Sequence, residues 1–208
     1  MIKKGLFVTF DGPNGVGKTS VFNGVADQLH QNGFEIVQTK EPTNSSLGRF
    51  ILQAEESYSG RTLASLVAAD RYFHLDSEVL PALRDGKIVL SDRYIESSLV
   101  LQRLDDVEIE FVWTLNSQVY VPDLSVILTA SPKILKKRLA QRVSLGRFER
   151  TRSRAKELQY YLEAVKFLSQ HGFNILLLDN ENVPLQENVN KVTKRIIEIT
   201  KKVKEVKI

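Results

Sequence analysis

A glycine-rich loop near the start of the chain has the residue types and spacing of a phosphate-binding loop, or P-loop. Its pattern is G-x-x-x-x-G-K-T, and it lies between an apolar run at residues 6–10 and an amphipathic stretch at residues 19–31. A strand before the loop and a helix after it form the context in which this motif is specific. Backbone N–H groups of such a loop surround phosphate oxygens at a helix N-terminus, which favours negative charge.

Two side chains of the P-loop indicate which phosphates it would bind. Lys18 is expected to reach the β and γ phosphates of a nucleoside triphosphate, and the Thr19 hydroxyl to ligate magnesium. The loop therefore predicts a site for ATP with Mg²⁺. The residues expected to bind the nucleotide there are Gly12, Pro13, Asn14, Gly15, Val16, Gly17, Lys18, Thr19 and Ser20.

A second acidic position follows another apolar run. Asp92 stands directly after residues 88–91, which read as a buried strand beside the first one. A carboxylate at the carboxyl end of that strand can orient magnesium or its water. An Asp-Arg pair such as Asp92-Arg93 can also be a structural salt bridge. With the P-loop upstream, we predict Thr19 and Asp92 as the metal ligands.

A strongly basic stretch follows in the second half of the chain. Gly146 gives it a flexible point, and we interpret residues 142–154 as a small lid that closes over bound phosphates. A solvated helix face or a nucleic-acid patch is the alternative interpretation. The basic residues of the stretch are Lys136, Lys137, Arg138, Arg142, Arg147, Arg150, Arg152 and Arg154.

Short apolar runs alternate with helical patterns along the whole chain. Runs at residues 6–10, 34–39, 88–90, 124–128 and 175–178 predict five strands separated by helices. This alternation predicts an α/β fold, with a five-stranded parallel sheet flanked by helices on both faces and right-handed crossovers. We expect one P-loop kinase domain over residues 1–208, with ligands at the carboxyl ends of the strands.

Composition limits the class of protein. The 208 residues are 42% hydrophobic, and 29 Lys and Arg against 25 Asp and Glu give a formal charge of only +4. This modest charge does not indicate a general nucleic-acid binder. The chain has no cysteine, which excludes disulfides and thiolate metal sites, and its apolar N-terminal run is too short to span a membrane. We expect a cytoplasmic protein with neither a membrane nor a nucleic-acid partner.

Several motifs in a fixed order resemble those of the thymidylate kinase family, bacterial type. Besides the P-loop and Asp92-Arg93-Tyr94, the resemblance rests on further motifs along most of the chain. These are Glu41-Pro42, Ala68-Ala69-Asp70-Arg71, Ser97-Ser98 with Gln102, Pro122-Asp123-Leu124 and the segment 142–149. The resemblance implies a P-loop NTPase fold, often a homodimer, and magnesium-dependent transfer of the ATP γ-phosphate to thymidine monophosphate, dTMP.

The resemblance also implies residue roles. Arg93 would hold the acceptor phosphate, Arg71 would reach the base or acceptor, and Arg147 would act as a lid arginine. Arg138 and Arg142 would lie on the ATP side. The implied catalytic residues are Lys18, Asp92, Arg93 and Arg147. The implied substrate-binding residues are Asp11, Asn14, Glu41, Pro42, Val67, Arg71, Arg93, Ser97, Ser98 and Gln102.

Several positions depart from the family pattern, most of them on the acceptor side. Asn14 replaces a carboxylate that meets the sugar 3′-hydroxyl, and nearby Asp11 is a possible substitute. Val67 replaces a phenylalanine that stacks on thymine, Leu101 replaces a tyrosine beside the ribose 2′-position, and Gly146 replaces a lid aspartate. These departures leave two further readings open: a kinase of another pyrimidine nucleotide or nucleoside, and a non-catalytic P-loop regulator.

Overall fold

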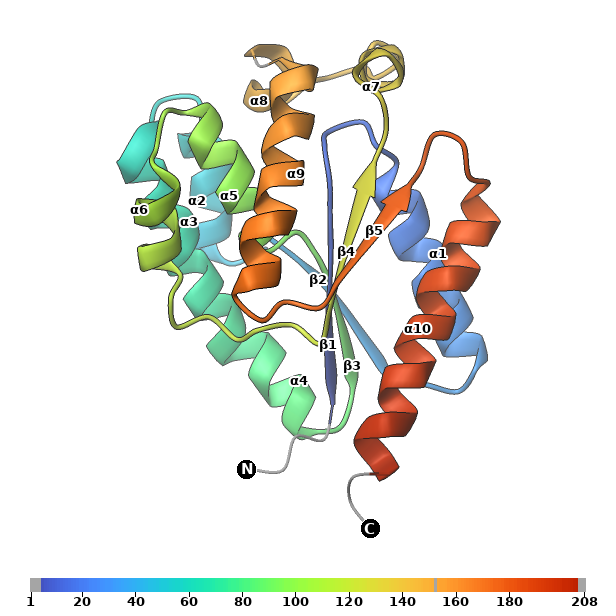
Figure 1. Ribbon diagram of the computed structural model, residues 1–208. Helices are drawn as coiled ribbons and strands as arrows, with labels where there is room; N and C mark the ends of the chain where they lie inside the picture. Colours follow the sequence, from blue (N-terminus) through green and yellow to red (C-terminus); the bar gives the residue numbers. More distant parts are fainter. Residues whose placement is uncertain (1–4, 152, 206–208) are drawn as a thin grey trace.

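The strands of this chain form one sheet with helices on both faces (Figure 1). The computed structural model describes residues 5–151 and 153–205, so Arg152 of the basic stretch lies outside the described residues. The strands are β1 (Leu6–Asp11), β2 (Ile36–Lys40), β3 (Ile88–Asp92), β4 (Leu124–Thr129) and β5 (Ile175–Asp179). They pair in parallel in the order β2-β3-β1-β4-β5, which confirms the predicted five-stranded parallel sheet.

The helices alternate with the strands. Their bounds are α1 (Lys18–Gln31), α2 (Ser46–Ala54), α3 (Gly60–His74), η1 (Leu75–Val79), α4 (Leu80–Arg84), α5 (Ile95–Leu104), α6 (Ile109–Leu115), α7 (Pro132–Leu139), α8 (Arg147–Thr151), α9 (Arg154–Gln170) and α10 (Leu185–Glu205). Helices α1 and α10 cover one face of the sheet, and α5 and α9 lie on the other (Figure 1). Each face has its own buried apolar core, because the central strands carry apolar side chains toward both layers.

The predicted strand positions are confirmed to within two residues. Helical patterns in the sequence also predict helices at residues 63–84, 98–113 and 133–142, and the structure differs from these in three places. The helix expected at residues 63–84 begins at Gly60 and contains a π-helical turn, η1, before α4. The mixed helical region expected at 98–113 is two helices, α5 and α6. The basic helix α7 ends at Leu139, three residues before Arg142. The sequence predicts the bounds of helices only weakly, because tertiary packing overrides helix propensity and helix ends differ by one or two residues between definitions.

The sheet order brings the ends of β1 and β3 together. Phe10 pairs with Asp92, and β1 is the central strand. Helices α7 and α8 lie at the end of the molecule toward which the β4 and β5 arrows point (Figure 1). In a parallel sheet this end is where ligands bind. The lid segment and the P-loop therefore share one end of the molecule.

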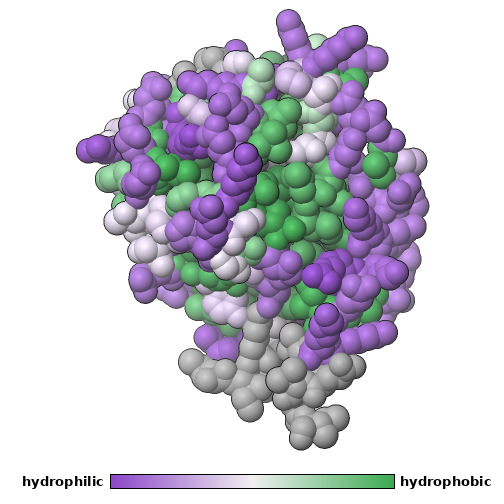
Figure 2. Space-filling model, viewed as in Figure 1, coloured by the Kyte–Doolittle hydropathy of each residue, from purple (hydrophilic) through white to green (hydrophobic). Residues whose placement is uncertain are grey.

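The face drawn in Figure 2 has apolar surface between polar margins. Leu177 of β5 is one of the exposed large apolar residues, at 43%. Across the described residues, no helix is both long enough and apolar enough to cross a membrane.

Candidate active site

The P-loop bends at two glycines whose positions do not accommodate a side chain. Gly12 has a φ of 142°, and a Cβ atom there would lie 2.4 Å from the carbonyl oxygen of Leu128. Gly17 has a φ of 95°, and a Cβ atom there would lie 2.8 Å from Nδ2 of Asn180. Glycine adopts such φ values readily and other residues rarely. A side chain at either position would strain the loop that leads into α1.

Lys18 and Asp92 meet where the P-loop approaches the end of β3. Nζ of Lys18 lies 3.3 Å from Oδ1 of Asp92. Burial lowers the pKa of Lys18, as does the Arg93 guanidinium, and the Asp92 carboxylate opposes both. Lys18 therefore brings a buried positive charge to the place predicted for the β and γ phosphates of a nucleoside triphosphate.

The oxygens around Asp92 fit a magnesium ion. Oδ1 of Asp92 is buried and belongs to the ion pair with Lys18. Thr19 is exposed and lines the same open cavity as Asp92. Magnesium takes one or two protein oxygens and completes its shell with phosphate and water. The Asp92 carboxylate and the Thr19 hydroxyl, which line one cavity, are such a donor set.

The two arginines predicted on the ATP side make different contacts. Arg138 donates hydrogen bonds of 2.9 Å to the backbone carbonyls of Val16 and Asn180, so it braces the P-loop. Arg142 is exposed and forms an ion pair with Glu149. Their contacts to a nucleotide stay a prediction.

Arg93 connects the P-loop to helix α5. Its guanidinium donates to Oδ1 of Asn14 at 2.8 Å and to Oγ of Ser97 at 2.8 Å. Arg93 also has a φ of 77°, which is uncommon for a residue other than glycine. Such outliers persist only where their surroundings hold them, and they gather at functional sites. These contacts fix the Arg93 side chain between the P-loop and the neighbouring cavity.

Asp11, which was predicted to contact the substrate, faces protein groups in this structure. Its carboxylate is fully buried and accepts hydrogen bonds from the Tyr161 hydroxyl at 2.7 Å and the Ser97 hydroxyl at 2.8 Å. The backbone N–H groups of Ser97 and Gly12 donate to it as well. Asp11 therefore ties β1 to α5 and α9, and both of its oxygens are already occupied by protein donors.

The carboxylate beside Asn14 belongs to Glu157 of α9. Its Oε1 accepts hydrogen bonds from the backbone N–H of Asn14 at 2.9 Å and from Nδ2 at 3.2 Å. Arg154, which forms an ion pair with Glu157, also donates to the carbonyl of Phe148. Burial raises the pKa of Glu157, and these hydrogen bonds and charges oppose the rise. Glu157 thus places a carboxyl group next to Asn14 from another element.

A cavity of about 190 Å³ opens beside Arg93 and collects most of the predicted acceptor residues. Its polar wall comes from the P-loop, α3 and α5, and its apolar wall comes from α2, α3 and α8. The predicted residues that line it are Asn14, Glu41, Pro42, Val67, Arg71, Arg93, Ser97, Ser98 and Gln102. Asp11 is the predicted substrate residue missing from this lining.

Arg71 is the buried centre of the polar wall. Its guanidinium donates to Glu41 at 2.9 Å, to Asn116 at 2.6 Å and to Ser98 at 2.9 Å. Arg71 is only 1% exposed, so these partners compensate a charge that has left water. A substrate group reaching this wall would therefore meet an arginine whose orientation is already fixed.

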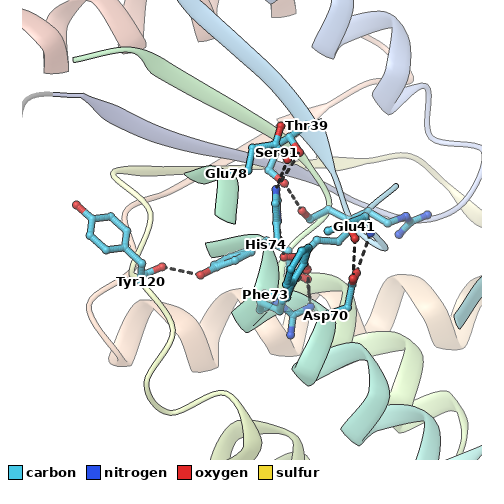
Figure 3. Close-up of polar contacts among 12 residues, drawn as sticks. Thr39, Glu41, Asp70, Phe73, His74, Glu78, Ser91 and Tyr120 are labelled. Carbon is cyan, nitrogen blue, oxygen red and sulfur yellow. Dashed lines mark hydrogen bonds and ion pairs between the residues drawn. The ribbon is translucent and has the colours of Figure 1, made fainter. Parts of the chain in front are cut away.

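A histidine that sequence analysis did not single out supports Glu41. Figure 3 shows His74 between Glu41 and Thr39, and its ring nitrogens lie 3.1 Å from Oε1 of Glu41 and 2.8 Å from Oγ1 of Thr39. Asp70, in the same view, accepts two hydrogen bonds from Thr43, from its backbone N–H and its hydroxyl. These contacts attach the loop after β2 to helix α3 and hold the Glu41 carboxylate against Arg71.

The predicted lid lies against the acceptor cavity. Helix α8 contributes Arg147 and Phe148 to its lining. Arg147 forms two hydrogen bonds to the Asp105 carboxylate, at 2.7 and 2.8 Å, and the Asp105 side chain is 1% exposed. Arg150 pairs with Glu56 at 2.7 Å at the exposed rim. In this structure Arg147 is therefore bound to Asp105, the residue that follows α5.

Glu96 lies buried under the P-loop strand. The Thr9 hydroxyl donates to its Oε1 at 2.6 Å, and its Oε2 has no hydrogen bond from the described residues. Burial, together with the negative charge of Asp11, raises the pKa of Glu96 from 4.5 to about 7. The folded protein therefore holds this proton more tightly than the unfolded chain does.

This raised pKa predicts a pH-dependent stability. The contribution of Glu96 is greatest below pH 4.5 and is lost as the pH rises through 7, so the free energy of unfolding should fall by on the order of 2 kcal/mol between pH 5 and pH 8. Urea denaturation at several pH values checks this, with Glu96→Gln expected to flatten the profile. The exposed Glu110→Gln is the matched control, and an equal slope in wild type and Glu96→Gln would contradict the prediction.

Comparison with known proteins identifies the family. The family described as thymidylate kinase matches residues 10–191. The chain belongs to the thymidylate kinase family. This match spans the P-loop, the acceptor cavity and the lid, and so covers every element that builds the candidate active site.

Individual relatives agree with the family match. The chain is 38% identical to a probable thymidylate kinase of Caldivirga maquilingensis over 149 residues, which cover 70% of this chain and 73% of that protein. It is 39% identical to a thymidylate kinase of Shouchella clausii, covering 64% and 67%. It is 32% identical to a thymidylate kinase of Staphylococcus epidermidis over 204 residues, covering 93% and 94%.

Proposed function

We propose that this thymidylate kinase family member transfers the γ-phosphate of ATP to dTMP, giving dTDP. One observation carries the proposal: the acceptor cavity, with Arg71 and Arg93 in its wall, shares Asn14 with the P-loop. A monophosphate bound at Arg93 would lie next to the loop that holds the triphosphate. Phosphoryl transfer needs such juxtaposition more than it needs covalent chemistry from the protein.

The catalytic roles follow from charge. Lys18 would neutralise the β and γ phosphates, and Arg93 the acceptor phosphate, so that two groups of like charge can come together. Thr19 and Asp92 would hold Mg²⁺, which supplies further neutralisation of phosphate charge when bound. The acceptor phosphate oxygen is itself the nucleophile, and no side chain is required as a general base.

The lid would complete this arrangement. We propose that residues 142–154 form the mobile part of a single kinase domain over residues 1–208. For Arg147 to act on the transferring phosphate, its guanidinium exchanges the Asp105 carboxylate for phosphate oxygens. Bidentate pairing suits arginine to both partners, which makes the exchange chemically reasonable.

An acceptor panel tests the proposed reaction. ADP release coupled to a spectrophotometric readout is followed with ATP, Mg²⁺ and each of dTMP, dUMP, dCMP, UMP, CMP and thymidine. We expect dTMP to give the highest kcat/KM. Preferential turnover of another acceptor would replace dTMP in the proposal, and no turnover of any acceptor would favour a nucleotide-binding regulator.

Three expectations stay part of the proposal. Magnesium dependence is tested by titrating EDTA into the assay, with activity expected to return when Mg²⁺ is restored. A homodimer, which the family resemblance implies, is tested by light scattering on the eluting protein. Cytoplasmic location is tested by cell fractionation.

A further inference from the structure

Phe148 of the lid is buried inside the apolar wall of the acceptor cavity. It is 8% exposed and packs in one cluster with Ile51 of α2 and Leu63 of α3, and Val67 and Leu101 lie partly buried against the same cluster. All five side chains line the cavity. A residue of the predicted lid thus forms part of the surface that an acceptor base would touch.

The cavity has few aromatic rings to offer a base. Among the residues that line it in the described chain, only Tyr94 and Phe148 are aromatic. Tyr94 is fully buried, packs edge-on against Phe7 and has the Arg71 guanidinium over its ring at 5.3 Å. Its ring is therefore already used by protein groups. Phe148 is the ring that reaches the cavity from the lid, and the Arg147 guanidinium lies near it as well.

Phe148 is also directly coupled to the lid arginine. The Arg147 guanidinium carbon lies 4.9 Å from the centre of the Phe148 ring, within the range of a cation–π contact. The Phe148 carbonyl accepts a hydrogen bond from Arg154, whose ion-pair partner Glu157 accepts from Asn14 of the P-loop. A chain of direct contacts therefore runs from the apolar wall to the nucleotide loop.

We propose that Phe148 is a specificity-determining residue that provides, from the lid, the aromatic contact to the acceptor base that Val67 lacks. This inference rests on the proposed function and concerns the same cavity. Offset stacking of a pyrimidine on a phenyl ring is the expected contact. Because Arg147 and Phe148 are adjacent, binding of the base also fixes the lid arginine, so base affinity and lid position are reciprocally linked.

Two variants distinguish stacking of the Phe148 ring on a base from packing of the Phe148 side chain in the apolar cluster. Phe148→Leu keeps an apolar side chain in the cluster but removes the ring, and the double variant Val67→Phe with Phe148→Leu returns a ring to the cavity from α3. The matched control is Phe50→Leu, because Phe50 is 45% exposed on α2 and does not line the cavity. Thermal unfolding of each variant shows whether it is folded.

The ligands are chosen to report on the base alone. Dissociation constants are measured for dTMP and for deoxyribose 5-phosphate, which has the sugar and phosphate but no base. We expect Phe148→Leu to weaken dTMP binding about tenfold, the loss typical of one stacked base, and to leave deoxyribose 5-phosphate binding unchanged. The double variant should regain most of the dTMP affinity, and Phe50→Leu should match wild type.

Two results would overturn the inference. Equal weakening of dTMP and deoxyribose 5-phosphate would mean that Phe148 only shapes the cavity, and unchanged dTMP binding in Phe148→Leu would mean that the ring does not touch the base. Both are read against wild-type protein that binds and phosphorylates dTMP. A wild-type chain that does neither refutes the proposed function itself, and the inference with it.

Discussion

Arg147→Ala is expected to lower kcat for dTMP phosphorylation by about a thousandfold, the lower end of what an arginine finger contributes. The lost guanidinium would otherwise neutralise charge that develops on the transferring phosphate. Because this interaction belongs to the transition state, the KM for ATP should change far less than kcat. Steady-state kinetics with saturating dTMP and varied ATP measure both quantities.

The same substitution also removes a buried ion pair, so its control must separate catalysis from stability. Asp105 is almost fully buried, and losing Arg147 takes two hydrogen bonds from its carboxylate. Adding Asp105→Asn removes the carboxylate charge that pairs with Arg147 in the wild-type protein. We expect Arg147→Ala with Asp105→Asn to fold as wild type does and to remain as inactive as Arg147→Ala.

Arg150→Ala is the matched control for position in the lid. Arg150 lies in the same helix, and it pairs with Glu56 at the exposed rim of the cavity. Exposed pairs of this kind contribute little to stability. Wild-type kcat in Arg150→Ala with a large loss in Arg147→Ala would assign the effect to one arginine, whereas equal losses would point to the general charge of the lid.

The sheet and its order of elements could be predicted because the signals are local. Five apolar runs separated by helical patterns are sufficient for a parallel sheet with two helical layers, and the P-loop marks its binding end. The sequence also placed Asp92 at the end of a strand beside the first one, and the pairing of β1 with β3 confirms this position. The grouping of the acceptor residues was predicted from the family resemblance, and the periodicity of apolar residues alone did not predict it.

Contacts between distant elements could not be predicted. Glu157 lies 143 positions from Asn14, and Asp105 lies 42 positions from Arg147. One signal was present: Glu157 shares a helical face with Tyr161, Ala164 and Leu168, all buried, so a glutamate interrupts an apolar stripe. A buried carboxylate on such a stripe needs a partner, but the sequence does not identify which residue it is.

These long-range contacts change how the departures from the family pattern are understood. Asn14 has lost the carboxylate of its own position, but Glu157 supplies a carboxylate beside it from α9. Val67 has lost a ring, but Phe148 supplies one from the lid. In both cases the replacement comes from the C-terminal half of the chain. Phe148 lines the acceptor cavity, whereas Glu157 is buried behind Asn14 and is not among the residues that line the cavity.

Lys18→Met is expected to lower kcat by about a thousandfold, the upper range for removing one group that stabilises charge in the transition state. Methionine keeps most of the apolar stem and removes the ammonium that would contact the β and γ phosphates. Burial already lowers the pKa of Lys18, so the folded protein loses little by giving up this charge. The free energy of unfolding should therefore stay within about 1 kcal/mol of wild type.

Activity and stability should thus separate at this position, and Lys191→Met provides the comparison. Lys191 is exposed on α10 and does not line the cavity that Thr19 and Asp92 share. Urea denaturation and steady-state kinetics on both variants measure the two quantities. A wild-type kcat in Lys18→Met would contradict a role for this lysine in catalysis. Strong destabilisation would contradict the expected stability and would show that the ion pair of Lys18 with Asp92 stabilises the fold. A lysine needed only for phosphate binding can be replaced without destabilising the free protein.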